Sequence, residues 1–177
     1  KSDVKFSKAR YFKPKYEIVD KSPYAYLLSW EGINDVRFLA NLFKNDIVSR
    51  VSEEPFSIEG REFNRGTLVI TRKGNEKHGS KFDEIIKNAG KKYDRRLFTV
   101  NTGFVTKGKD FGSSSMRVVK RPKIGLVSGD GVSSSRYGEV WHYFERQIEF
   151  PVTVLGTDYF MQIPKHNFDI LIFGSKD

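Results

Sequence analysis

Short apolar runs alternate with amphipathic stretches along most of the chain, and this alternation constrains the fold more than any other feature. The run YAYLLSW at 24–30 precedes GINDVRFLANLFKND, in which apolar residues recur at helical spacing, and similar pairs follow later in the chain. Aromatic and aliphatic side chains suit a buried strand, whereas spacings of three and four residues place side chains on one helical face. The pattern predicts an α/β protein with mostly parallel sheets and flanking helices.

The same pattern divides the chain into parts. We expect a lead-in arm or strand at 1–20, an α/β unit at 21–106, a connection at 107–120 and a second unit at 121–177. The connection is rich in glycine and serine, as loops commonly are. Within the first unit we predict helices near 33–45 and 79–92.

Individual glycines and acidic residues add local expectations to the first unit. Gly90 is expected near the end of the second helix, because glycine is common where helices stop. Glu59 and Gly60 separate two alternating runs and therefore predict a β-hairpin turn. Asn34 or Asp35 is available to cap the first helix.

The second unit runs strand (IGLVSG), loop (DGVSSS), helix, strand (VTVLG), connection and strand (FDILIFG). We predict a parallel strand-helix-strand-strand piece whose helix begins near Ser134 and packs through Val140, Trp141 and Phe144. Three strands with one helix leave one sheet face poorly covered. We therefore expect the natural protein to continue past Asp177.

Composition excludes several classes of site. The 177 residues include no cysteine, which removes disulfides, thiolate metal ligands and cysteine nucleophiles. No apolar run approaches the ~20 residues that a membrane-spanning helix needs, and no signal peptide opens the sequence. The net charge is +9, and the excess lies entirely in residues 1–120, because residues 121–177 hold 6 Lys and Arg against 7 Asp and Glu.

That basic excess raises the possibility of nucleic-acid binding, since displaced counterions drive such binding. No RNA-binding motif, recognition-helix pattern or zinc finger accompanies the charge, and acidic residues are interspersed with the basic ones. A solvated lysine-rich surface is the preferred interpretation, and nucleic acid is not an expected partner.

The loop between the predicted strand and helix of the second unit is the first candidate site. Gly129, Asp130, Gly131, Ser133 and Ser134 could present backbone N–H groups and hydroxyls to a small anion at the start of the helix. The stretch matches neither GxxxxGK[ST] nor GxGxxG. A tight strand-to-helix turn, with a serine from 133–135 as helix cap, is the preferred interpretation.

His142 and Glu145 form the second candidate, an HxxE pair on one helical face. A catalytic zinc needs three protein ligands and a water, and the other histidines, His78 and His166, have no recognisable ligand setting. We therefore expect no metal in this chain. Glu139, Trp141 and His142 are assigned to packing of the helix, with Trp141 anchoring it to the sheet and His142 partly buried.

A serine nucleophile is the third candidate, since serine can lie on a sharp strand-to-helix elbow in hydrolases. The elbow motif GxSxG is absent, because the loop reads GDGVSSS, and no base and acid partner follows. None of the three chemistries is established by the residues alone.

The block RPKIGLVSGDGVSSSRYGEVWHYFERQIEFPVTVL, with SPYAYLLSW, PFSIEGREFNRGTLVI and VNTGFVTKGKDFGSSSMRVVKRPK before it, resembles a known region over about residues 22–173. It is similar to the region after the catalytic domain of large zinc carboxypeptidase-like proteins of Bacteroidetes-type bacteria. In those proteins a G-x-G-V-S-S loop and a G-E-V-W-H helix open a domain similar to class I glutamine amidotransferases, with a flavodoxin-like fold.

The resemblance implies fold and context and no catalytic residue. The metal-binding HxxE of such peptidases lies ahead of this region, and the amidotransferase nucleophile is a cysteine, which this chain lacks. The implied function is a non-catalytic accessory region, secreted or periplasmic, whose partner is the peptidase domain of the same parent chain. Zinc is then expected only in that domain. The alternative is a module that binds a small anion or a peptide with the loop at Gly129–Ser135.

Overall fold

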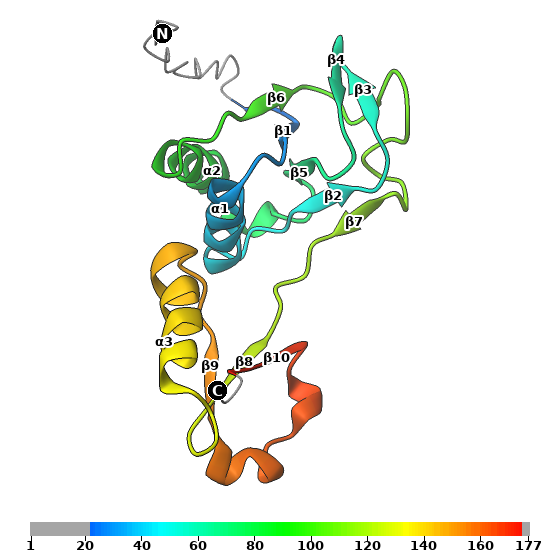
Figure 1. Cartoon of the computed structure of the whole chain (residues 1–177). Coiled ribbons are helices and arrows are strands. Elements are labelled where there is room, and N and C mark those ends of the chain that lie inside the picture. The colour runs from blue at the N-terminus through cyan, green and yellow to red at the C-terminus, as the bar shows by residue number, and fades with distance from the viewer. Residues whose placement is uncertain (1–21, 175–177) are drawn as a thin grey trace, which may run out of the picture.

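The computed structural model describes residues 22–174 and shows a protein of mixed helices and sheets. Two units are joined by an extended segment between strands β7 and β8 (Figure 1). The arm or strand expected at 1–20 lies outside the described residues.

The first unit contains most of the strands and two α-helices. Its elements are β1 (Ala25–Leu28), α1 (Ile33–Lys44), β2 (Arg50–Ser52), β3 (Phe56–Ile58), β4 (Arg61–Phe63), β5 (Leu68–Thr71), the 3₁₀ turn η1 (Glu76–His78), α2 (Lys81–Lys92), β6 (Phe98–Val100) and β7 (Met116–Val118). Both helices lie where the apolar spacing predicted them. The β3–β4 hairpin also turns at the predicted place, with Glu59 and Gly60 both at positive φ.

The five-stranded sheet of this unit has the order β6-β1-β5-β2-β7, and all its pairings are antiparallel. The prediction of a parallel sheet is therefore wrong for this unit. Helix α1 connects β1 to β2, which run in the same direction but leave room for β5 between them, and α2 connects β5 to β6 around β1. This is the split β-α-β arrangement of ferredoxin-like sheets. Apolar periodicity identifies the helix but does not state how many strands its crossover spans.

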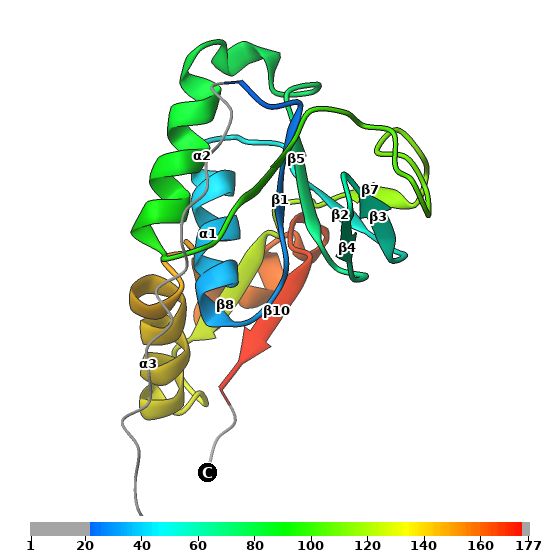
Figure 2. The same ribbon diagram turned by 90° about the horizontal axis from the view of Figure 1, so that it is seen from above.

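Both faces of this sheet are covered. Helices α1 and α2 pack on one face, and the β3–β4 hairpin with the loop that precedes β7 packs on the other (Figure 2). Tyr26 and Leu28 of β1 join the core under the helices. Ala25 and Leu27 join the core under the hairpin. All four are at most 1% exposed, which explains the continuous apolar run of this strand.

The ends of the two helices depend on polar and close-packing contacts. Asp35, in the first turn of α1, accepts hydrogen bonds of 2.7 Å from the backbone N–H groups of Glu31 and Gly32, and its other oxygen lies 2.6 Å from Arg95 Nε. Gly90 was predicted to mark the end of α2, but it lies inside the helix. A Cβ at Gly90 would be only 2.9 Å from Leu97 Cδ1, so the glycine allows the following strand segment to pack closely.

The predicted connection at 107–120 is only partly a connection. Strand β7 lies within it and pairs with β2 at the edge of the five-stranded sheet. Phe111 is 4% exposed and Met116 is 6% exposed, and both belong to the core under the hairpin. The first unit therefore extends to about Val118, and the extended segment that leaves it is short.

The second unit is a smaller parallel sheet with one α-helix. Its elements are β8 (Ile124–Ser128), α3 (Ser134–His142), the π-helical turn η2 (Tyr143–Gln147), β9 (Thr153–Gly156), the 3₁₀ turns η3 (Thr157–Gln162) and η4 (Lys165–Asn167), and β10 (Ile170–Phe173). Strands β9 and β10 pair in parallel with β8 on either side, in the order β10-β8-β9. The predicted parallel strand-helix-strand-strand piece and the helix start at Ser134 are confirmed.

Close packing across this sheet requires glycine in its central strand. A Cβ at Gly125 would lie 2.6 Å from Leu155 Cδ1 of β9 and 2.8 Å from Leu171 Cδ2 of β10. Leucines from both edge strands therefore meet over the position that a side chain would occupy, and any larger residue in the middle of β8 would separate them.

A third apolar cluster joins the two units. Its buried members are Ala40 of α1, Ile124 of β8, and Ile148 and Phe150 of the segment before β9. Partly buried side chains from α1, η2, the segment before β9, and β10 complete it: Val36, Phe43, Phe144, Val152 and Ile172. The two units therefore share a core. Helix α1 packs both on the sheet of its own unit and in this shared core.

Candidate functional site

The carboxyl ends of β8, β9 and β10 meet at the loop that the sequence singled out. Gly129 and Gly131 have φ of 126° and 82°, values that side chains rarely allow, so the chain can turn sharply from β8 into α3. The backbone N–H of Val132 donates to the carbonyl of Gly129 at 3.1 Å and closes the turn. Because parallel strands place ligands beyond their carboxyl ends, this edge is the candidate site of the second unit.

A serine of the loop was predicted to cap α3, but no serine side chain does so. Ser133 occupies the cap position in an extended conformation, but its side chain makes no hydrogen bond to the helix backbone. Its hydroxyl instead lies 3.1 Å from that of Ser135. The hydroxyls of Ser133 and Ser135 therefore interact with each other, while Ser134 and Asp130 are exposed.

Thr157, which sequence reasoning missed, lies at the same edge. A Cβ on Gly129 would be 2.3 Å from Thr157 Oγ1, so the hydroxyl lies directly against the glycine turn. This hydroxyl is shielded from solvent and has no hydrogen-bond partner among the described residues. Its position immediately after β9 was the available signal, because the residue after each parallel strand reaches the carboxyl edge.

These groups can hold a small anion but provide no strong nucleophile or base. Backbone N–H groups and hydroxyls donate hydrogen bonds to carboxylate or phosphate oxygens. The exposed Asp130 places a negative charge beside them, which disfavours a highly charged ligand.

The HxxE pair lies at a change in helix geometry. His142 is the last residue of α3, whereas Glu145 belongs to the π-helical turn η2, and both are exposed. Within residues 22–174 no three or more His, Asp or Glu side chains are grouped so that they could hold a metal ion. No third ligand therefore joins this pair from the described part of the chain.

The packing roles assigned to this helix need correction. Trp141 is 37% exposed and belongs to none of the core clusters, so the prediction that it anchors α3 to the sheet is wrong. His142 was expected to be partly buried and is exposed, as is Glu139. Phe144 packs into the shared core as predicted, whereas Val140 belongs to none of the core clusters. Helical spacing located the apolar side of the helix less well than its start.

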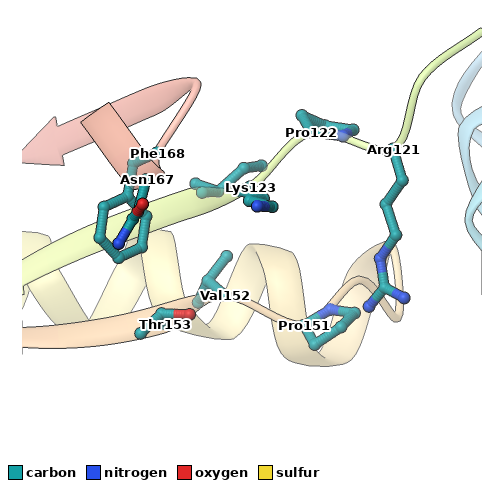
Figure 3. A pocket seen from close by; sticks show the side chains of 9 residues that line it. Arg121, Pro122, Lys123, Pro151, Val152, Thr153, Asn167 and Phe168 are labelled. Atoms are coloured by element: carbon teal, nitrogen blue, oxygen red, sulfur yellow. The ribbon is translucent and has the colours of Figure 1, made fainter. Parts of the chain in front are cut away.

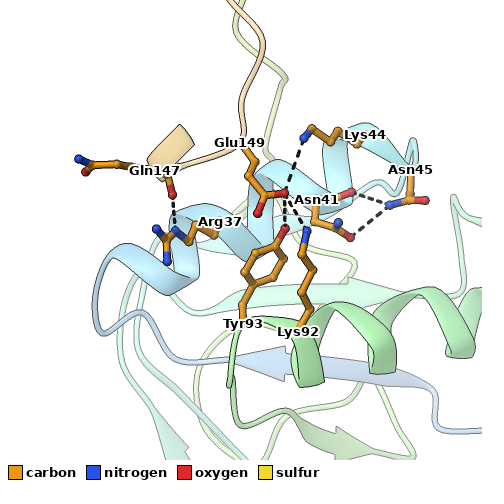
Figure 4. Close-up of polar contacts among 8 residues, drawn as sticks. All are labelled: Arg37, Asn41, Lys44, Asn45, Lys92, Tyr93, Gln147 and Glu149. Atoms are coloured by element: carbon orange, nitrogen blue, oxygen red, sulfur yellow. Dashed lines mark hydrogen bonds and ion pairs between the residues drawn. The ribbon is translucent and has the colours of Figure 1, made fainter. Parts of the chain in front are cut away.

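A polar cluster at the junction of the units centres on Glu149. Its Oε2 accepts hydrogen bonds from Lys92 Nζ at 2.7 Å and from Tyr93 Oη at 3.1 Å, and lies 3.9 Å from Lys44 Nζ (Figure 4). Hydrogen bonding from Lys92 lowers the pKa of Glu149, and the same contact raises the pKa of Lys92. Nearby, Arg37 Nε donates to the carbonyl of Gln147. Both helices of the first unit are thus bound to one short segment of the second.

A hollow of about 750 Å³ opens at the opposite, amino-terminal end of the parallel strands. It is lined by the segment that enters β8, the segment that enters β9, and the residues before β10 (Figure 3). Arg121, Lys123, Thr153 and Asn167 supply its polar groups. We call it the basic hollow, and nothing in the sequence analysis pointed to it.

No protein-family model matches the chain, and neither a curated protein nor a solved structure gives a significant match. Among residues 22–174 no helix is both long and apolar enough to span a membrane.

Proposed function

We propose that this chain is a non-catalytic accessory region of a zinc carboxypeptidase-like protein. In this proposal a peptidase domain outside the chain holds the zinc and hydrolyses the peptide, and the region described above supports that domain or helps to present substrate. The parent protein is then secreted or periplasmic, as the resemblance in the sequence implies.

The strand order of the second unit is the observation that supports the proposal most. Numbered within that unit, β9-β8-β10 is the order 2-1-3, with all pairings parallel. A flavodoxin-like sheet begins with the same three strands in the same order and adds its remaining strands beside the third. The resemblance in the sequence implies such a fold, and this strand order agrees with it.

The contacts between the two units favour an accessory role for the chain. A shared apolar core and the Glu149 cluster hold the two units together. These contacts restrict movement of one unit relative to the other. A region that presents peptide to a neighbouring active site needs such rigidity, because small displacements of a substrate reduce the rate of its reaction.

Two assays on the purified chain test the proposal. With zinc added, it should release no C-terminal residue from a set of peptides and should bind no stoichiometric zinc by mass spectrometry of the metal. A double variant, His142→Ala with Glu145→Gln, serves as the control for the HxxE pair. Peptidase activity that copurifies with the chain and disappears in the double variant would overturn the proposal.

A second candidate function is the binding of a small anion at the Gly129–Ser135 loop. The shielded Thr157 hydroxyl without a partner favours it, because a buried hydroxyl gains most when a ligand satisfies it. Calorimetry with acetate, phosphate and short peptides tests the idea. Thr157→Val should weaken any binding at the loop, and heat of binding that Thr157→Val leaves unchanged would remove this candidate.

A further inference from the structure

The basic hollow combines positive charge with apolar walls. Its charged groups are Arg121 and Lys123, both exposed, which flank Pro122 on the segment that enters β8. Its apolar surface comes from five residues on three segments: Pro122, Ile124, Pro151, Val152 and Phe168. Pockets that bind small molecules usually have this composition, in which apolar walls surround a few well-placed polar groups.

The two cations have no acidic partner in the part of the chain that the structure describes. Among residues 22–174 neither Arg121 nor Lys123 forms an ion pair with a carboxylate. Arg121 instead lies over the ring of Phe150, with its guanidinium carbon 5.8 Å from the ring centre. Such stacking holds a guanidinium in place while its N–H groups remain available to an anion.

One acidic residue that contacts this segment is already engaged. Asp169 accepts a hydrogen bond of 2.8 Å from the backbone N–H of Lys123, and its own N–H donates to the carbonyl of Lys123 at 2.9 Å. This exchange holds the start of β10 against the start of β8. It fixes the backbone at Lys123 and leaves the ammonium of that residue for another partner.

Two neutral polar groups line the hollow as well. The Asn167 amide comes from the 3₁₀ turn before β10, and the Thr153 hydroxyl comes from the first residue of β9 (Figure 3). Both can donate hydrogen bonds to an oxygen anion, and the amide can also accept one from an N–H group. Donors from three segments therefore surround one volume of about 750 Å³, a size within the usual range for small-molecule sites.

We propose that the basic hollow binds a small organic carboxylate with an apolar body, of the kind that the last residue of a peptide provides. Arg121 and Lys123 hold the carboxylate, and Phe168 with the prolines contacts the apolar body. The choice of a peptide as the source rests on the proposed accessory role. The carboxylate site itself rests only on the charges and walls of the hollow.

Calorimetry on the whole chain with matched probes tests the proposal. N-acetylphenylalanine should bind, and its amide should bind at least about tenfold more weakly, because charge-assisted hydrogen bonds are the stronger ones. Inorganic phosphate should bind more weakly than N-acetylphenylalanine, because it lacks an apolar body. Raising the salt concentration from about 50 to about 500 mM should lower the affinity for the acid, because salt screens exposed charges. Equal binding of acid and amide, no binding of either at millimolar concentration, or stronger binding of phosphate overturns the proposal.

Variants locate the site. Arg121→Gln and Lys123→Gln should each weaken binding of the acid about tenfold. Lys109→Gln, an exposed cation of the first unit that does not line the hollow, should leave binding unchanged. Thermal unfolding of each variant checks that its fold is intact. Binding that survives both Arg121→Gln and Lys123→Gln in folded proteins overturns the assignment.

A longer probe separates this inference from the proposed function. N-acetyl-Gly-Gly-Phe should bind about as well as N-acetylphenylalanine if the hollow accepts peptide ends. Binding of the short acid alone would overturn the peptide source and leave the carboxylate site in place. Peptidase activity of the chain, by contrast, would overturn the accessory role without affecting the calorimetry.

Discussion

The Lys92 ammonium lies 2.7 Å from the Glu149 carboxylate and connects the last turn of α2 to the segment that precedes β9. The two residues are 57 positions apart and belong to different units. Around them, Tyr93 and Lys44 also contact the carboxylate, so one acidic side chain joins both helices of the first unit to the second.

Replacing Glu149 with Gln should therefore loosen the junction. The side chain is 35% exposed and Lys92 is 52% exposed, so solvent screens the pair and we expect a loss of only about 1 kcal/mol in the free energy of unfolding. Chemical denaturation measures it. Glu145→Gln, which removes an exposed acid of the same segment, should change stability by much less; equal losses in the two variants would contradict the assignment.

The Glu149 contribution should depend on pH. Its pKa is lowered from 4.5 in the folded protein, mainly by the hydrogen bond from Lys92, so the folded state favours the charged form. The stabilisation is complete above the ordinary pKa and is lost as pH falls through the lowered one. The difference in unfolding free energy between the parent and Glu149→Gln should thus shrink below pH 4.5. A constant difference from pH 7 to pH 3 would contradict this.

A second polar cluster should stabilise the first unit. Asp83 accepts hydrogen bonds from Tyr26 at 2.6 Å and from Arg72 at 2.6 and 2.7 Å. Burial acts to raise the pKa of Asp83, but the bonds from Arg72 and Tyr26 outweigh it and the pKa is lowered. Burial also raises the pKa of Tyr26, so this residue remains a donor.

Tyr26→Phe should cost about 1 kcal/mol of unfolding free energy, because Asp83 keeps its bonds from Arg72. Arg72→Leu should cost more, about 2–3 kcal/mol, because it leaves a mostly buried carboxylate without its charged partner. Denaturation curves at pH 7 give both values. If Arg72→Leu were the milder variant, the ion pair would not be the main stabilising contact of this cluster.

Two aromatic residues of the α3 segment should differ in their contribution to stability. Phe144 packs into the core shared by the units, whereas Trp141 is 37% exposed and outside every core cluster. Phe144→Ala should therefore cost about 2–3 kcal/mol and Trp141→Ala about 1 kcal/mol. Thermal or chemical unfolding of the two variants compares them directly. A larger loss for Trp141→Ala would mean that the indole is packed more tightly than its exposure indicates.

Two glycines of the β8–α3 loop provide a matched pair. Gly131→Ala meets no atom within 4 Å and should cost only the strain of its positive φ, about 1 kcal/mol. Gly129→Ala also drives a methyl group into the Thr157 hydroxyl and should cost about 2–4 kcal/mol. Unfolding free energies test the order. In the double variant Gly129→Ala with Thr157→Ser, part of the loss should remain, because the clash is with the oxygen.

Local pattern predicted the helices and the second sheet well. The spacing of apolar residues located α1 and α2, and glycines between apolar runs predicted the turns at Gly60 and Gly131, where both glycines have positive φ. These features depend on neighbours within a few residues, which the sequence displays directly. The direction of pairing in the first sheet was predicted wrongly, because β5 enters between β1 and β2 from a position later in the chain.

The candidate sites divide in the same way. The Gly129 loop was found from its residues, since glycine and serine between a strand and a helix are a local signal. Thr157 reaches that loop only because β9 pairs with β8, and Arg121 and Asn167 line one hollow only because β10 pairs on the other side. Contacts of this kind are set by strand pairing between distant segments, which no single-sequence pattern reports.

The sequence by itself determined the positions of the α-helices and of most strands, which loop turns through glycine, and that the chain lacks cysteine chemistry. Only the tertiary structure decided that the first sheet is antiparallel, that β7 belongs to it, and that Glu149 joins the units. The physical reason is the distance along the chain over which each kind of interaction acts. Backbone geometry and side-chain periodicity act over a few residues, whereas strand order and shared cores follow from how much apolar surface distant segments can bury against one another.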